Sequence, residues 1–188
     1  GEPIDKDISK LMLILKLHAV CRGFSGVRPQ TIHRILWMID NDICPCVPEK
    51  GSVGASGDLA PLAHLFLPLI GLGEVFFKGE KVSMDKVLAD FKFSPIILGP
   101  KEGLALINGT QFIAAHSVFA LYRMHNTLDT ADITGALSLE GLMGSSKPFD
   151  PRLHAIRPFI GNQHVANRLL NLLKGSKINE AHLDCNRV

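Results

Sequence analysis

The sequence predicts a mainly α-helical protein with one small β-hairpin, and three observations lead to that fold class. Apolar residues recur at three- and four-residue spacing along most of the chain, which is the periodicity of helices packed on a core. From Gln111 to about Gly144, apolar residues occupy nearly every helical face, as in a long buried helix. Only Val75 to Val82 has the pattern of two short strands joined by a turn.

The N-terminal part is predicted to form two helices. Asp5 or Asp7 can accept hydrogen bonds from the free amides of a helix that runs to about Arg22. Gly23 then ends this helix, because glycine readily takes the left-handed conformation of a helix C-terminus. Pro29 is expected at the first position of the second helix. The apolar face of that helix repeats at Ile32, Ile35, Leu36 and Ile39.

Residues 44–58 contain two prolines and several glycines and show no apolar period, so they are predicted to form a loop. A helix from Leu59 to Ile70 follows, and Pro68 predicts that this helix kinks or ends early. The hairpin comes next. A short helix from Met84 to Phe91 and an irregular stretch to Gly99 follow the hairpin.

The C-terminal part is predicted to contain several helices. Pro100 can open a helix that the Asn108-Gly109 pair ends, and Thr110 can cap the long helix after it. Pro151 begins a short helix, and another runs from about Asn162 to Lys174. Because a helix that is apolar all round has to be covered, the long helix is expected to lie in a large core or a subunit interface.

Composition excludes several classes of protein. The chain has 188 residues, of which 46% are hydrophobic and 20% charged, as in an ordinary folded domain. A net charge of +2 with scattered basic residues gives no basic surface for nucleic acid. The most apolar stretch, Leu59 to Gly73, is too short for a bilayer and is interrupted by Pro61, His64 and Pro68, so no membrane segment is expected.

The cysteines and histidines show no metal-binding pattern. Four cysteines, Cys21, Cys44, Cys46 and Cys185, fit neither a disulfide scaffold nor a four-ligand zinc site. We interpret them as free thiols of a reducing cytoplasm. The eight histidines have no ligand spacing such as His-Glu-x-x-His, so no metal is expected.

The segment Gly51 to Asp58, with the sequence Gly-Ser-Val-Gly-Ala-Ser-Gly-Asp, is the most unusual in the chain. It lacks the Gly-Lys-Ser/Thr ending of a phosphate loop and the Gly-x-Gly start of a dinucleotide fingerprint. It also lacks the Gly-x-Ser-x-Gly of a hydrolase elbow, because Gly57 follows Ser56 directly. From the residues alone, a glycine loop remains, with Asp58 capping the next helix.

Three segments in order resemble the family of histidine, phenylalanine and tyrosine ammonia-lyases and their related aminomutases. These are Ala55 to His64 (Ala-Ser-Gly-Asp-Leu-Ala-Pro-Leu-Ala-His), Glu102 to Gln111 (Glu-Gly-Leu-Ala-Leu-Ile-Asn-Gly-Thr-Gln) and Phe149 to Pro158 (Phe-Asp-Pro-Arg-Leu-His-Ala-Ile-Arg-Pro). The resemblance covers essentially the whole chain. It implies a long-helix bundle of the fumarase/aspartase-like type that assembles as a cytoplasmic homotetramer.

The resemblance also implies a self-made electrophile, a 4-methylidene-imidazole-5-one ring. In this family the glycine amide nitrogen attacks the alanine carbonyl and two waters leave, so Ala55, Ser56 and Gly57 would form the ring. Gly57 and Ala55 are small enough for the close approach, and Ser56 loses its hydroxyl to leave the methylidene carbon. Asp58 would support the loop as well as cap the helix at Leu59, and Asn108 would hydrogen-bond at the electrophile.

The implied reaction is the non-oxidative deamination of L-histidine to urocanate and ammonia, because the Gly51 to His64 string is closest to the histidine enzymes. Two alternatives stay open: a tyrosine or phenylalanine ammonia-lyase or aminomutase, and a catalytically inactive homologue that acts only in assembly. The resemblance implies that residues 1–188 are an internal fragment of the catalytic domain. The N-terminal segment with the family's catalytic tyrosine and the C-terminal part are then absent, and residues 179–188 are expected to complete no element.

Overall fold

The computed structural model describes residues 1–54 and 57–182 and confirms the mainly helical fold with a small antiparallel sheet. The chain divides into two compact units, residues 1–120 (unit 1) and residues 121–188 (unit 2). In the described ranges, no helix combines the length and the apolar character needed to cross a membrane.

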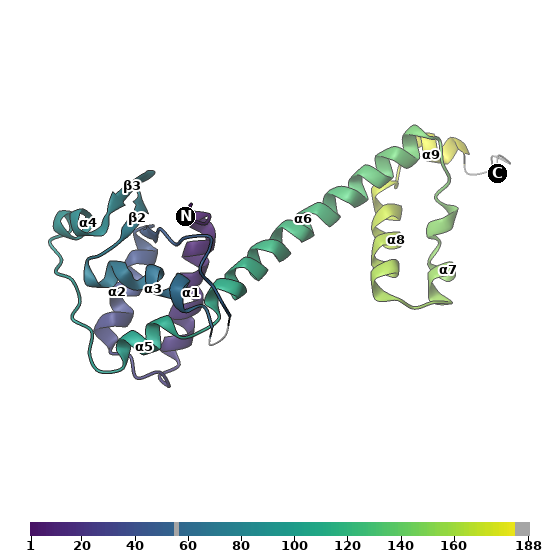
Figure 1. The fold of residues 1–188 in the computed structure, drawn as a ribbon. Helices are drawn as coiled ribbons and strands as arrows, with labels where there is room; N and C mark the ends of the chain where they lie inside the picture. Colours follow the sequence, from purple (N-terminus) through teal and green to yellow (C-terminus); the bar gives the residue numbers. More distant parts are fainter. Residues whose placement is uncertain (55–56, 183–188) are drawn as a thin grey trace. The chain divides into compact units, whose positions relative to one another are not determined.

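Unit 1 holds most of the described elements, and Figure 1 labels its α-helices and the strands β2 and β3. They are α1 (Lys6–Cys21), α2 (Pro29–Asp40), β1 (Cys44–Pro45), α3 (Leu59–Phe66), the 3-10 helix η1 (Leu67–Ile70), β2 (Glu74–Phe77), β3 (Glu80–Ser83), α4 (Met84–Asp90) and α5 (Glu102–Ile107). The long helix α6 (Gln111–Gly141) begins in unit 1. It continues into unit 2, where η2 (Lys147–Phe149), α7 (Pro151–Ala155), α8 (Ile160–Leu172) and α9 (Lys177–His182) follow.

Local signals set the ends of the first helices as predicted. The Asp5 side chain accepts the Asp7 N–H at 2.8 Å at the start of α1, and Gly23 follows its end with φ +80°. Pro29 is the first residue of α2. The helix predicted to reach Ile70 stops being α-helical at Phe66 and tightens into η1 around Pro68.

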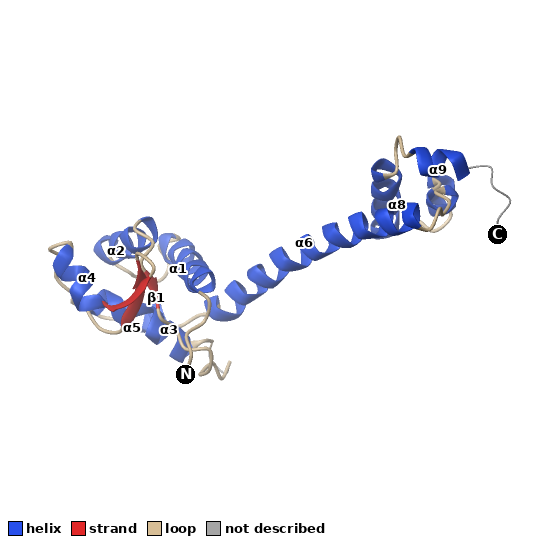
Figure 2. Ribbon diagram, turned by 90° about the horizontal axis from the view of Figure 1, so that it is seen from above, coloured by secondary structure: helices blue, strands red, loops and turns tan. Residues whose placement is uncertain are grey.

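The sheet has three strands rather than the predicted two (Figure 2). The hairpin of β2 and β3 is confirmed, with Val75 opposite Val82. The loop prediction for residues 44–58 was wrong at its start, where β1 pairs with β2 and Cys44 lies opposite Phe76. A strand of two residues that includes a proline is too short to show a period in the sequence. These residues form a strand only because they pair with the edge of β2.

One apolar core holds unit 1 together. Its fully buried side chains include Met12, Leu13, Ile35, Met38, Leu62, Leu65 and Leu106. Burying a leucine completely stabilises the fold by about 1.5–3 kcal/mol. Leu62 and Leu65 therefore fix α3, and Leu106 fixes α5, so that the loops before α3 and after α5 are held at defined places.

The long helix was predicted to lie in a large core or a subunit interface, and within this chain its middle part is not buried, so the interface stays a prediction. Residues 121–131 of α6 are all exposed, and Leu121, Tyr122, Met124 and Leu128 are each more than half exposed. Near the end of this stretch, Arg168 of α8 forms ion pairs with Asp129 and Asp132 of α6. The apolar pattern predicts that this helix is covered, yet in the described residues these four apolar side chains stay more than half exposed.

A last helix, α9, was not predicted from the sequence. Residues 179–188 were expected to complete no element, yet Asn179 lies within α9 and is only 8% exposed. Its side-chain Oδ1 accepts the Ser146 hydroxyl at 2.9 Å, and its Nδ2 donates to the Gly144 carbonyl at 3.3 Å. These contacts come from residues more than 30 positions away, so no local pattern announces them.

Candidate active site

Two segments far apart in the sequence meet beside the start of α3. Gly57 and Gly109 form an isolated parallel β-bridge, and the Asp58 N–H donates to the Gly109 carbonyl at 2.7 Å. The first segment is the C-terminal end of the glycine loop, Gly51 to Asp58. The second contains Asn108, so two of the segments that the sequence singled out are in contact.

Gly57 has no room for a side chain. Its φ is +98°, a conformation that strains every residue with a Cβ. A Cβ built at this position would meet the backbone carbonyl of Gly109, with its carbon only 2.9 Å away. Glycine is therefore required here for close packing of two backbones, in addition to the approach that ring formation would need.

The Asp58 carboxylate links three segments of the chain. Its Oδ1 accepts the Ser52 hydroxyl at 2.7 Å, and its Oδ2 accepts the N–H groups of Phe112 at 3.1 Å and Ile113 at 3.2 Å. The side chain is fully buried. It thus links the glycine loop to the first turn of α6.

The predicted capping role of Asp58 needs correction. Asp58 occupies the N-cap position of α3, but its side chain makes no capping hydrogen bond to that helix. Thr110 was expected to cap α6 by accepting hydrogen bonds from its first amides. The N–H groups of Phe112 and Ile113 donate to Asp58 instead. Asp58 is therefore the cap of α6, because the fold brings the free amides of that helix against its carboxylate.

Asn108 ends α5 with an extended backbone (φ −93°, ψ 122°), and Gly109 takes the positive φ of the pair. The Asn108 carbonyl accepts the ammonium of Lys16, a residue of α1, at 2.6 Å. Lys16 is only 3% exposed, and this burial lowers the pKa of its ammonium to about 8. Lys16 was not predicted as a site residue, although its helical spacing from the buried Leu13 and Val20 places it on the apolar face.

Glu102 fixes the other end of α5. The helix begins at Glu102 rather than at Pro100, after Lys101 with φ +68°. The Glu102 carboxylate is 1% exposed and accepts the Arg28 guanidinium at 2.7 Å, the Thr31 hydroxyl at 2.9 Å and the Gly99 N–H at 2.6 Å. The Arg28 guanidinium, helped by the other donors, lowers the pKa of Glu102 to about 2. An anion held in this way locks α5, and hence Asn108, onto the start of α2.

Ala55 and Ser56 lie outside the described residues. The predicted site residues that the structure does place, Gly57, Asp58 and Asn108, come together around Gly109. No group of three or more metal-binding side chains occurs in the described ranges. Burial raises the pKa of the Cys44 thiol to about 11 and also raises that of Cys46, so neither is an activated thiolate.

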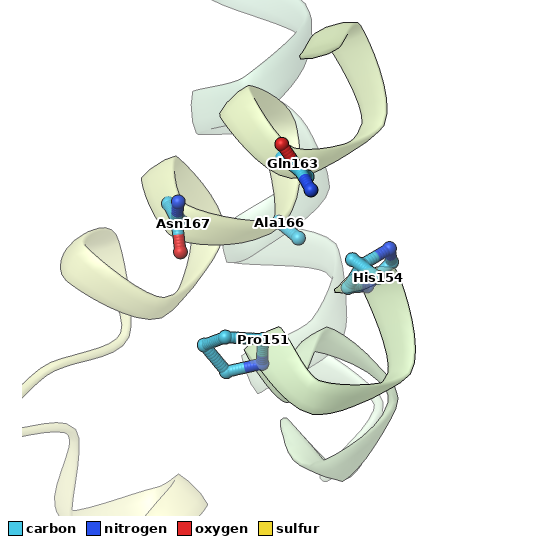
Figure 3. Close-up of a pocket in the computed structure, with 5 residues that line it drawn as sticks. All are labelled: Pro151, His154, Gln163, Ala166 and Asn167. Atoms are coloured by element: carbon cyan, nitrogen blue, oxygen red, sulfur yellow. The ribbon is translucent and has the colours of Figure 1, made fainter. Parts of the chain in front are cut away.

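Unit 2 contributes a separate pocket of about 220 Å³ between α7 and α8. Figure 3 shows His154 of α7 facing Gln163, Ala166 and Asn167 of α8 across it. The His154 Nε2 lies 3.1 Å from the Pro148 carbonyl, so the ring already has a partner. This pocket contains none of the residues that the sequence predicted for the site.

Comparisons with known proteins place the chain in one family. The family described as aromatic amino acid lyase matches residues 1–188. A histidine ammonia-lyase of Stigmatella aurantiaca is 44% identical over the whole chain, which spans 37% of that relative's length. The crystal structure of histidine ammonia-lyase from Trypanosoma cruzi has a TM-score of 0.84 and 38% identity, over 90% of this chain and 34% of that one. The crystal structure of tyrosine aminomutase from Streptomyces globisporus has a TM-score of 0.89 and 35% identity, over 95% of this chain and 34% of that one.

Proposed function

Because the chain belongs to the aromatic amino acid lyase family, we propose that it is part of an enzyme that converts L-histidine to urocanate and ammonia. The observation that carries the proposal is the contact between Gly57 and the asparagine segment. Gly57, the last residue of the triplet, bridges to Gly109, which directly follows Asn108. The triplet would cyclise with loss of two waters to the 4-methylidene-imidazole-5-one ring.

The described residues fit such a ring. Gly57 is packed so closely on Gly109 that only a residue without a side chain can stand there. Asp58 holds the loop through Ser52 on one side and α6 on the other, which would limit the conformations open to the triplet. The ring would supply an electron sink, which the ordinary side chains of proteins, mostly nucleophiles, cannot provide. Asn108, held at the end of α5, would donate a hydrogen bond at that group.

The choice of histidine as substrate is supported by the similarity to two bacterial histidine ammonia-lyases, at 44% and 43% identity. The similarity to tyrosine aminomutase in fold supports the alternative, an enzyme that acts on another aromatic amino acid. Residues 1–188 would then be an internal fragment of the catalytic domain in either case. An inactive homologue that acts only in assembly is the third possibility.

The exposed apolar side chains of Leu121, Tyr122, Met124 and Leu128 on α6 support assembly with further helices. The whole enzyme is proposed to be a cytoplasmic homotetramer, with Tyr122, Leu121 and Leu128 among the residues covered by partner helices. Light scattering of the full-length protein would test this: a tetramer is expected, and a stable monomer would contradict it.

The test of the function uses the full-length enzyme and two measurements. Mass spectrometry of the peptide that contains Ala55 to Gly57 should show the loss of two waters. Incubation with L-histidine should release ammonia together with the ultraviolet absorbance of urocanate. Turnover of tyrosine or phenylalanine with histidine inert would assign the enzyme to the alternative substrates. An unmodified triplet in fully active enzyme would refute the ring, and an intact ring with no turnover would favour the assembly-only homologue.

A further inference from the structure

Lys16 is a buried cation that the proposed reaction does not use. It lies on the inner face of α1 and is 3% exposed, with the buried Met12, Leu13 and Val20 at helical spacing around it. Placing an ammonium in such surroundings is costly, since water is replaced by apolar side chains. In the ranges that the structure describes, no carboxylate forms an ion pair with it. A methionine or leucine would satisfy the core equally well, so the ammonium itself needs an explanation.

The ammonium has one hydrogen-bond acceptor in the described chain, the main-chain carbonyl of Asn108 at 2.6 Å. The next carbonyl, that of Gly109, accepts the Asp58 N–H at 2.7 Å. Two successive peptide groups of the asparagine segment are thus fixed by separate donors. One donor comes from α1 and the other from the loop that carries the triplet. The contact between Lys16 and Asn108 joins residues 92 positions apart, so it is a tertiary contact.

From this arrangement we infer that Lys16 is a positioning residue for Asn108. It holds the Asn108 backbone so that the amide side chain is presented to the electrophile in one orientation. The inference rests on the proposed function. It differs from a purely stabilising role of Lys16, such as neutralising the C-terminal end of α5, in what it predicts for catalysis. Misplacing a catalytic group by a fraction of an ångström to 1 Å costs up to about 100-fold in rate.

The test compares Lys16→Met with Lys10→Met in the full-length enzyme. Lys10 lies on the same helix and forms an exposed ion pair with Asp42, so its replacement controls for the loss of a lysine from α1. Three quantities are measured: the ring content from the mass of the triplet peptide, kcat and KM per ring-containing subunit, and deuterium uptake of the peptide that spans residues 104–112. A double-mutant cycle with Asn108→Ala completes the set.

We expect Lys16→Met to lower kcat by about 10- to 100-fold with KM and ring content unchanged. Deuterium uptake should rise in residues 104–112, and Lys10→Met should change none of these quantities. Lys16→Arg, which keeps a charged donor, should recover most of kcat. In the Asn108→Ala background, Lys16→Met should have almost no further effect on kcat, because the amide side chain that Lys16 is inferred to position is then absent.

Several outcomes would overturn the inference. An unchanged kcat per ring in Lys16→Met is one, and ring content that falls in proportion to activity is another, since Lys16 would then act in maturation. Additive effects in the double-mutant cycle would also exclude it. If Lys16→Met does not fold, the same measurements are made on Lys16→Gln, whose side chain is too short to keep the 2.6 Å contact. Failure of the proposed function is seen separately, because the unaltered enzyme would then lack the ring or the release of ammonia.

Discussion

The carboxylate of Asp58 accepts the backbone N–H of Phe112 at 3.1 Å across 54 positions of sequence, and so caps a helix to which it does not belong. We predict that Asp58→Ala destabilises the full-length protein by about 2–4 kcal/mol, since it leaves buried amides without an acceptor. Activity should fall by more than the loss of folded protein explains, because the glycine loop also loses its link to Ser52. Urea denaturation and ring content by mass spectrometry measure the two effects.

Asp5→Ala is the matched control for Asp58→Ala. Asp5 also occupies an N-cap position and accepts one backbone N–H, that of Asp7, but at an exposed place. Its loss should cost about 1 kcal/mol and leave ring content and activity unchanged. Equal losses of unfolding free energy in the two variants would show that the long-range contacts of Asp58 stabilise the fold no more than an ordinary exposed helix cap.

Gly57→Ala should destabilise the protein by about 2–4 kcal/mol and prevent the bridge to Gly109, because its Cβ would meet the Gly109 carbonyl. Gly54→Ala is the control in the same loop. Gly54 also has a positive φ, +68°, but no atom lies within 4 Å of its Cβ position. It should cost only about 1–2 kcal/mol, from the backbone conformation. Thermal unfolding of both variants isolates the effect of the contact, and identical midpoints would contradict it.

Ser56→Ala should abolish ring formation and nearly all activity while leaving the helices intact. The substitution removes the hydroxyl whose loss would create the methylidene carbon. Mass spectrometry should find the triplet peptide without the loss of two waters, and circular dichroism should match that of the unaltered enzyme. Activity retained at a substantial level in this variant would mean that the electrophile is not formed from Ser56.

Glu102 should make the protein sensitive to acid in a defined range. Its pKa falls from 4.5 in the unfolded chain to about 2 in the fold, chiefly through Arg28, so the folded state favours the anion. The stabilisation is complete above pH 4.5 and is lost as the pH falls toward 2. Because Arg28 is half-exposed, we expect only about 1–3 kcal/mol over this range. Urea denaturation at several pH values should show a smaller acid loss for Glu102→Gln than for the unaltered protein.

Residues 1–188 expressed alone should not deaminate histidine, even if the ring forms. The resemblance assigns the base to a tyrosine outside these residues, and a positioned base is worth about 10²–10⁴-fold in rate. Tyr122 is not expected to replace this base, because its side chain is exposed on α6. The chain should also associate through the exposed apolar residues of α6, which size-exclusion chromatography would detect. A monomer that turns over histidine at the full enzyme's rate would contradict both expectations.

Local patterns were enough to predict much of the fold. Asp5, Gly23 and Pro29 mark helix ends by properties of their own backbones, and they do so in the structure. The hairpin around Lys78-Gly79 was predictable for the same reason. The site segments were identified by their resemblance to a family of known chemistry. The comparisons support that family over the whole chain.

The sequence by itself therefore determined the helices with clear end signals, the hairpin, and the positions of the triplet and of Asn108. Only the tertiary structure decided which helix Asp58 caps, that Lys16 holds the Asn108 carbonyl, and that β1 joins the sheet. The physical reason is the distance between partners along the chain. A cap within one turn is visible as a motif, whereas a hydrogen bond across 54 or 92 residues forms only after the core of unit 1 has brought its two ends together.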